Sequence, residues 1–138
     1  MSTEAADAGT SAVERLEIGR GDRRRAPLPG GPDVEILIGA QEGRPIGVLH
    51  VTVPPGGVMP AHEHGASEVL LISLGGEARV VDAQDGAVTE LAPGAMATIP
   101  VGRRVSLENP GSQPARLLVV LTPPDFAEQL TSWPSATG

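Results

Sequence analysis

Apolar and polar residues alternate in several short runs along the chain, and other short runs are apolar throughout, with glycine and proline between them. Such alternation is typical of β-strands that bury one face. Turn residues recur roughly every eight to twelve positions, which favours an all-β sandwich or barrel. The runs cover residues 12–18, 33–39, 46–54, 67–74, 77–83, 87–93, 95–100, 104–109 and 115–123.

The pattern changes to helical spacing only in residues 123–133. Asp125 can cap a helix there, with Glu128 completing a capping-box-like pair. We expect the helix to plug an end or side of the β-structure, and a moving lid over an active site is the alternative. One face of this helix carries Phe126, Leu130 and Trp133.

The length of 138 residues suits one domain, which we place at residues 13–138. Residues 1–12 are small and polar without periodicity, so we expect a disordered tail. No signal peptide and no membrane-spanning segment is evident, which indicates a cytoplasmic protein. Abundant alanine, glycine, proline and valine, with arginine as the only basic residue type, suggest a bacterial source.

The formal net charge of -7 argues against a nucleic-acid partner, which needs a concentrated basic surface. The basic run Arg20–Arg25 is the exception. It could bind an anionic partner, but we interpret it as a solvated linker between two strands.

Two of the three histidines and a glutamate lie within the seven residues HEHGASE. On a strand, His62 and His64 project from one face and can converge on a metal ion, and Glu68 could add a carboxylate from the next strand. The alternative is that both histidines lie on the surface beside a turn. Thiolate ligands and disulfides are excluded because the chain has no cysteine.

The spacing around these residues resembles the first motif of the cupin superfamily. Residues 56–75 match it without a mismatch, from Gly56 through His62, His64 and Glu68 to Gly75. Residues 94–109 are similar to the second motif at Gly94, Pro100, Gly102 and Asn109, but Val105 stands where the family carries its last metal-binding histidine.

The resemblance implies a single-domain cupin of the conserved-barrel type, a double-stranded β-helix or jelly-roll barrel, to which the pattern of residues 123–133 adds a short C-terminal helix. It also implies a divalent metal (Fe, Mn, Co, Ni or Zn) on His62, His64 and Glu68. The expected function is dioxygenase, isomerase or cyclase chemistry on a small organic molecule.

Val105 leaves three outcomes open. The three remaining ligands could hold a metal by themselves, with an open coordination position. His50 could replace the missing imidazole, if it and Thr52 face the cavity. Finally, the metal could be lost, leaving a non-catalytic barrel that binds or senses a ligand, or an imidazole and carboxylate pair that transfers protons.

Further residues could line such a cavity. Met59 could contribute to an apolar pocket, and Arg104, beside Val105, could recognise an anionic group, although both also fit ordinary core and surface roles. The expected partners are a small molecule and a second copy of the chain. We expect the homodimer because exposed edge strands are commonly paired or covered.

Overall fold

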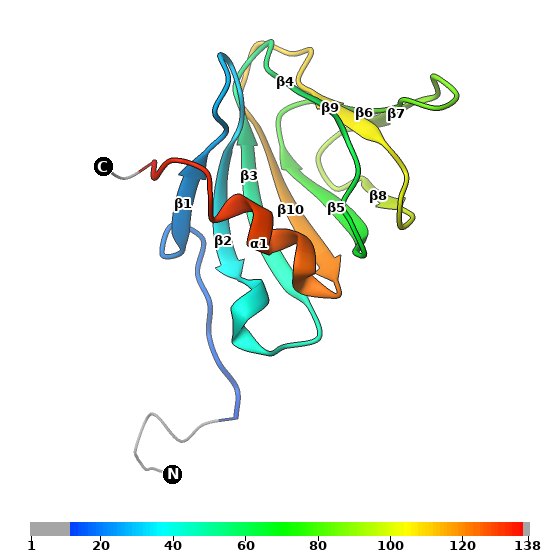
Figure 1. Ribbon diagram of the computed structural model, residues 1–138. Coiled ribbons are helices and arrows are strands. Elements are labelled where there is room, and N and C mark those ends of the chain that lie inside the picture. The colour runs from blue at the N-terminus through cyan, green and yellow to red at the C-terminus, as the bar shows by residue number, and fades with distance from the viewer. Residues whose placement is uncertain (1–11, 137–138) are drawn as a thin grey trace.

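A computed structural model describes residues 12–136 as two facing β-sheets and a short C-terminal helix (Figure 1). All neighbouring strands within the sheets are antiparallel. One sheet has the order β1 (Asp22–Arg25), β2 (Asp33–Ile38), β3 (Gly47–Val53), β10 (Ala115–Thr122), β5 (Glu68–Gly75) and β8 (Met96–Ile99). The other has the order β4 (Val58–His62), β9 (Val105–Glu108), β6 (Ala78–Asp82) and β7 (Val88–Leu91). The predicted all-β jelly-roll barrel is confirmed.

The core lies between the sheets because alternate strand residues point inward. On β5 the inward residues Val69 and Leu71 are buried, and on β10 Leu117 and Leu121 are fully buried. Aliphatic side chains make up most of this core, as the scarcity of aromatic residues requires.

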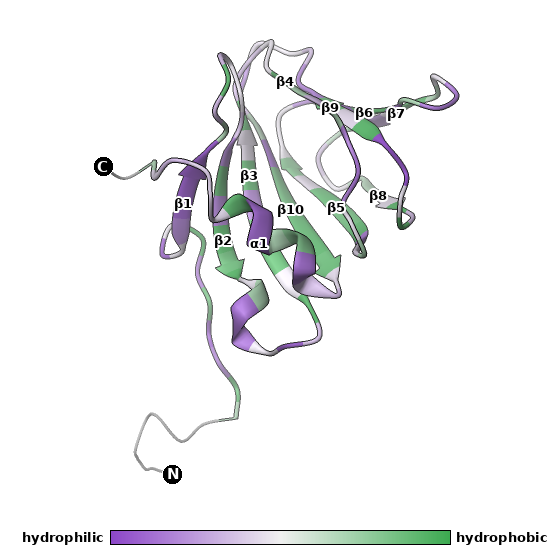
Figure 2. Ribbon diagram, viewed as in Figure 1, coloured by the Kyte–Doolittle hydropathy of each residue, from purple (hydrophilic) through white to green (hydrophobic). Residues whose placement is uncertain are grey.

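Strand β10 is central in the six-stranded sheet, between β3 and β5. Figure 2 shows long hydrophobic stretches on these three strands, whereas β1 at the sheet edge is hydrophilic. The sequence ARLLVVLT of β10 is apolar at both inward and outward positions. Such continuous runs are typical of strands that are covered on both faces.

The C-terminal helical segment consists of a 3-10 turn η3 (Pro124–Phe126) and α1 (Ala127–Leu130). It lies in front of the six-stranded sheet in Figure 1. The predicted cap was wrong, because the segment starts after Pro123 and Asp125 lies within the 3-10 turn without capping it. A further 3-10 turn, η2 (Ala40–Glu42), precedes β3.

The N-terminal part of the described chain differs from two predictions. Residues 12–18 form no strand and are exposed, so their alternation is not that of a half-buried strand. The basic run forms β1 instead of a linker. Its Arg24 guanidinium donates hydrogen bonds to the carbonyl oxygens of Thr131 and Trp133, at 2.8 and 2.9 Å, and so fixes the end of the C-terminal segment. Apart from Ala12, the predicted tail lies outside the described residues.

Asn109 joins two turns at one end of the barrel. Its buried side-chain amide donates to the carbonyl oxygens of Val53 and Gln113, and its side-chain oxygen accepts from the Gly111 N–H. These bonds hold the turn after β3 against the turn after β9.

Within residues 12–136, no helix has the length and apolar character needed to cross a bilayer.

Candidate functional site

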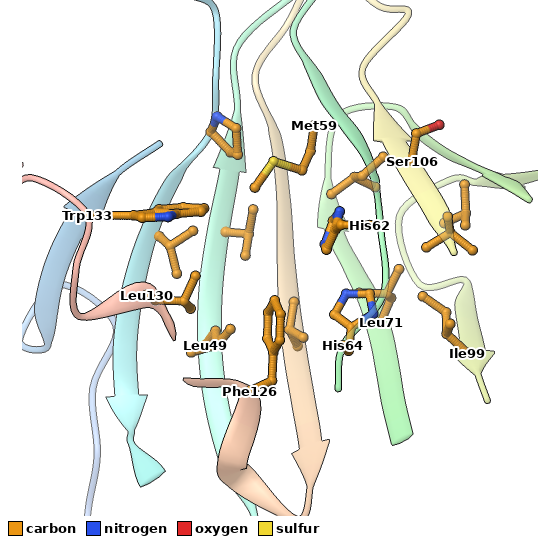
Figure 3. Close-up of a pocket in the computed structure, with 17 residues that line it drawn as sticks. Leu49, Met59, His62, His64, Leu71, Ile99, Ser106, Phe126, Leu130 and Trp133 are labelled. Atoms are coloured by element: carbon orange, nitrogen blue, oxygen red, sulfur yellow. The ribbon is translucent and has the colours of Figure 1, made fainter. Parts of the chain in front are cut away.

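A cavity of about 70 Å³ lies between the two sheets, beside the C-terminal segment (Figure 3). Aliphatic side chains from both sheets form its walls, and the two histidines of the HEHGASE stretch lie on one side. The residues that line it are Pro32, Val34, Leu49, Val51, Met59, His62, His64, Leu71, Val80, Ile99, Val105, Ser106, Leu107, Val119, Phe126, Leu130 and Trp133.

An irregularity in strand β4 turns His62 toward this cavity. Met59 pairs with Leu107 and His62 pairs with Val105, so three steps on β4 correspond to two steps on β9. The extra residue shifts the inward and outward alternation. Met59 and His62 therefore both line the cavity although they are an odd number of positions apart.

His64 follows β4 in the turn that leads to β5 and lies against His62. The two ring centroids are 4.6 Å apart. The Phe126 ring stacks on His62 with a centroid separation of 6.0 Å and meets His64 edge-on at 4.7 Å. The helical segment thus presses an aromatic ring against both imidazoles, which restricts their movement and their contact with water.

Hydrogen bonding defines the tautomer of the neutral His62 ring. Its Nδ1 lies 2.8 Å from the carbonyl oxygen of Pro60. Because a carbonyl oxygen can only accept, Nδ1 carries the hydrogen, and Nε2 of the neutral ring is left as an acceptor. In the neutral ring this backbone contact therefore leaves Nε2 as the nitrogen that could take a proton.

His64 is held in its neutral form. Burial, together with the neighbouring His62, lowers the pKa of His64 to about 4. Its Nδ1 is buried and has no hydrogen-bond partner among the described residues. Buried polar atoms are normally paired, so this nitrogen is a natural contact for a polar atom of a bound molecule.

The cavity carries no charged side chain among the described residues that line it. The nearby arginines are occupied elsewhere. Arg103 forms ion pairs with Asp82 at 2.6 Å and Asp85 at 3.2 Å, and Arg104 donates to the carbonyl oxygen of Ala61. Arg104 therefore does not take the predicted anion-binding position in the cavity. A phosphate or carboxylate inside would meet no compensating cation.

A wider hollow of about 540 Å³ opens outside the cavity. The cavity and the hollow share part of their walls, so His62 stands at the junction of the two. The shared residues are Met59, His62, Phe126, Leu130 and Trp133. Phe126, Leu130 and Trp133 thus lie on one surface, which forms the wall of the entrance, although α1 ends at Leu130 and Trp133 follows it.

Ser67 connects the histidine turn to this wall. Its side chain is fully buried, and its hydroxyl donates to the carbonyl oxygen of Pro123 at 2.6 Å and accepts from the Phe126 N–H at 3.3 Å. Sequence reasoning missed Ser67, because a serine in a short turn gives no sign of such a distant partner.

The structure brings together two of the three predicted metal ligands. Glu68 is exposed at the start of β5, on the opposite face from the buried Val69 and Leu71. Within the described residues, no group of three or more His, Cys, Asp or Glu side chains is placed to hold a metal ion. Two imidazoles alone do not provide the three protein ligands of a typical catalytic site, so these side-chain positions do not fit the predicted metal. The divalent metal stays a prediction.

The remaining predicted residues divide between the two faces of the sheets. Met59 and Val105 line the cavity. His50 and Thr52 do not, because Leu49 and Val51 take the inward positions of β3. Buried on the outer face, His50 has its Nδ1 3.9 Å from Glu35, and burial followed by the charge of Arg116 lowers the pKa of His50. His50 therefore does not replace the missing imidazole.

Comparison with known families identifies the barrel. The family model of the Cupin domain matches residues 49–121, which is more than half of the chain. This match includes the whole four-stranded sheet, the six-stranded sheet apart from β1, β2 and the ends of β3 and β10, and the two cavity histidines. No curated protein sequence matches the chain.

Solved structures similar to the chain have the same barrel. The polyketide cyclase RemF from Streptomyces resistomycificus is 25% identical, with a TM-score of 0.67 over 80% of this chain and 79% of that one. A sugar phosphate isomerase from Silicibacter pomeroyi is 26% identical, with a TM-score of 0.64 over 79% and 75%. A Cupin 2 conserved barrel protein from Salinispora arenicola, 20% identical, has a TM-score of 0.66 over 88% and 98%.

Proposed function

Since the chain belongs to the cupin family, whose barrel here encloses two imidazoles in an uncharged cavity, we propose that it binds a small, neutral, largely apolar carbonyl compound and transfers a proton on it. His62 would act as the base. The observation that carries the proposal is the pairing of His62 and His64 in a cavity without charged side chains.

The chemistry follows from the two rings. A carbon–hydrogen bond next to a carbonyl group is weakly acidic, and His62 Nε2 can accept that proton as the enolate forms. A hydrogen bond to the carbonyl oxygen lowers the energy of the enolate, and neutral His64 can donate one from its protonated nitrogen. Returning the proton to carbon or oxygen completes an isomerisation, and attack of the enolate carbon on a second carbonyl group closes a ring.

The similar structures support this choice of reaction. They include a cyclase and an isomerase, two reaction classes that commonly proceed through enols. A sugar phosphate carries an anionic group, whereas this cavity offers no cation to balance one. The proposal that the ligand is neutral therefore rests on the residues that line the cavity of this chain.

The two connected spaces indicate the shape of the ligand. Ligand pockets are usually about 300–1,000 Å³, so the inner cavity of about 70 Å³ admits only one end of a typical ligand. The outer hollow of about 540 Å³ can hold the rest. A planar molecule would insert its reacting end beside His62 and leave its remainder against Phe126 and Trp133.

Hydrogen–deuterium exchange of a model ketone tests the proposal. The neutral bicyclic ketone 2-tetralone is incubated with the protein in D₂O and a chelator, and deuterium uptake next to the carbonyl group is followed by NMR. We expect deuterium uptake to be faster than in buffer alone. His62→Gln should reduce the rate above that of buffer about 100-fold. Glu90→Gln, which alters an exposed carboxylate on β7, should leave the rate of uptake unchanged.

Trp133 provides a separate measurement of binding. It is the single tryptophan of the chain and lines the entrance, so its fluorescence should be quenched saturably by 2-tetralone. The anion 2-naphthoate should bind at least about tenfold more weakly. Uptake equal to that in buffer would overturn proton transfer, and equal binding of both probes would overturn the neutral ligand class.

A separate binding experiment tests the predicted divalent metal site. Fe(II), Mn(II), Co(II), Ni(II) or Zn(II) is added after the chelator has been removed, and bound metal is measured by elemental analysis. Close to one metal per chain, lost in His62→Ala and Glu68→Gln, would support the predicted ligand set. If His62→Ala loses the metal and Glu68→Gln keeps it, Glu68 is not a ligand.

A further inference from the structure

The outer face of the six-stranded sheet carries an apolar surface that the described chain leaves partly exposed. We call it the outer apolar face, and it consists of Val48, Leu70, Ile72, Met96, Leu118 and Val120. Strand register places these side chains in adjacent rows. Met96 pairs with Ile72 and Ile72 with Leu118, while Leu70 pairs with Val120 and Val120 with Val48. They therefore form one continuous surface.

This surface is unusual for a sheet that faces water. Antiparallel sheets with one solvated face normally alternate apolar and polar residues. Strand β9, VSLE, follows that rule, whereas β5 and β10 have apolar residues at successive inward and outward positions. The outer side chains still meet solvent, and Met96 is 61% exposed. An apolar surface of this kind marks an interaction site.

Charges at the two ends of the face indicate what covers it. Glu68 lies at one end, opposite Thr122, and Arg116 lies at the other, opposite Gly75. Both side chains belong to the outer face and are exposed. Among the described residues, Glu68 forms no ion pair with a basic side chain and Arg116 none with a carboxylate.

A surface with opposite charges at its two ends is complementary to itself. If two copies pack face to face about a two-fold axis that crosses the strands near Leu71 and Val119, each Glu68 lies over the Arg116 of the other copy. The apolar rows then meet at the centre. Such a two-fold interface buries the same patch on both subunits.

We propose that a second copy of this chain packs on the outer apolar face, with Glu68 and Arg116 pairing across the interface. The homodimer expected from the sequence pairs or covers edge strands, whereas the interface proposed here uses the face of a sheet. The interface lies on the opposite side of the sheet from the cavity, so each barrel keeps its own entrance. It is independent of the function proposed above.

Sedimentation velocity of the full chain tests the interface. The wild-type protein should sediment as a dimer, with twice the 14.1 kDa of one chain. Ile72→Glu puts two carboxylates at the centre of the interface and should raise the dissociation constant at least about 100-fold. The matched control is Val88→Glu, at a 53% exposed position on the other sheet, which should remain dimeric.

Charge reversal gives a second test with variants at exposed positions. Glu68→Arg and Arg116→Glu should each weaken the dimer at least about tenfold, because each places like charges together. The double variant should recover the wild-type constant to within about threefold. A monomeric wild type, equal behaviour of Ile72→Glu and Val88→Glu, or no recovery in the double variant would overturn the proposal.

Discussion

The chemistry of the site depends on how single residues are held. The Pro60 carbonyl group fixes the tautomer of His62, and burial keeps His64 neutral. The sequence predicts that these two histidines converge because i and i+2 positions share a strand face, but His64 lies in the turn after β4, so they meet for a different reason. The sequence does not indicate the tautomer of His62 or the burial that keeps His64 neutral, because those depend on a backbone carbonyl and on the Phe126 ring, which folding brings to the site.

The low pKa of His64 predicts a pH-dependent stability. The folded protein protonates His64 only near pH 4, whereas the unfolded chain does so near 6.5. Between these values the unfolded state binds more protons, so the free energy of unfolding rises with pH and levels off above 6.5. The contribution of His64 to this rise in unfolding free energy amounts to about 3 kcal/mol.

Urea unfolding from pH 4 to 7 in a chelator measures the effect. His64→Gln should have a shallower pH dependence than the wild type, so that the difference in unfolding free energy changes by about 3 kcal/mol across the range. Parallel curves would show that His64 is not buried in its neutral form.

Val105 offers a gain-of-function prediction. It is buried, lines the cavity and pairs directly with His62 across β4 and β9. Val105→His adds a third imidazole beside His62 and His64, so the affinity for Zn(II) should rise at least about tenfold over the wild type. The larger ring should cost about 1–3 kcal/mol of stability.

Calorimetric titration with Zn(II) checks this change. Val101→His, at an exposed position in the turn before β9, serves as the control and should bind no tighter than the wild type. If both variants behave alike, the position opposite His62 does not lead into the histidine cluster.

At the scale of elements, the strands were more predictable than their contacts. Runs such as 115–123 correspond to strands because half of their side chains must be buried. By contrast, the alternation in residues 12–18 forms no strand, and the basic run became β1. Arginine side chains are tolerated on an edge strand because they can point to solvent, and Arg24 also finds carbonyl partners far along the chain.

Ser67 predicts how firmly the helical segment is attached. Ser67→Ala removes one hydrogen bond to Pro123 and one from Phe126, so it should destabilise the protein by about 1–3 kcal/mol. Since that segment carries Trp133, its fluorescence should also shift toward that of an exposed indole.

Ser73→Ala is the matched control for this change. Ser73 is as deeply buried, but its hydroxyl has no hydrogen-bond partner among the described residues, so its loss should cost less than about 0.5 kcal/mol. Equal destabilisation by the two variants would mean that the Ser67 contacts do not hold the segment.

For the whole molecule, the barrel could be predicted from the motifs and their turns. Which face of a sheet each side chain occupies could not be predicted. The bulge in β4 rotates His62 inward, and Glu68 lies on the outer face. A motif records only spacing along the chain, so it does not report a shift in register.

The dimer makes the melting temperature depend on protein concentration. Mass action stabilises an associated native state, so a tenfold increase in concentration should raise the melting temperature by about 2 °C. Ile72→Glu should melt at a temperature that is independent of concentration. A wild-type melting temperature that stays constant across three tenfold dilutions would contradict the association.

The central place of β10 also determines the order in which the molecule can form. This strand is the last one in the described chain, yet it lies between β3 and β5 and pairs with both. During synthesis the earlier strands leave the ribosome without the element that joins them, so the six-stranded sheet closes only after residues 115–122 have emerged. Until then β3 and β5 each present an open apolar edge, which makes the nascent chain a natural client for chaperones.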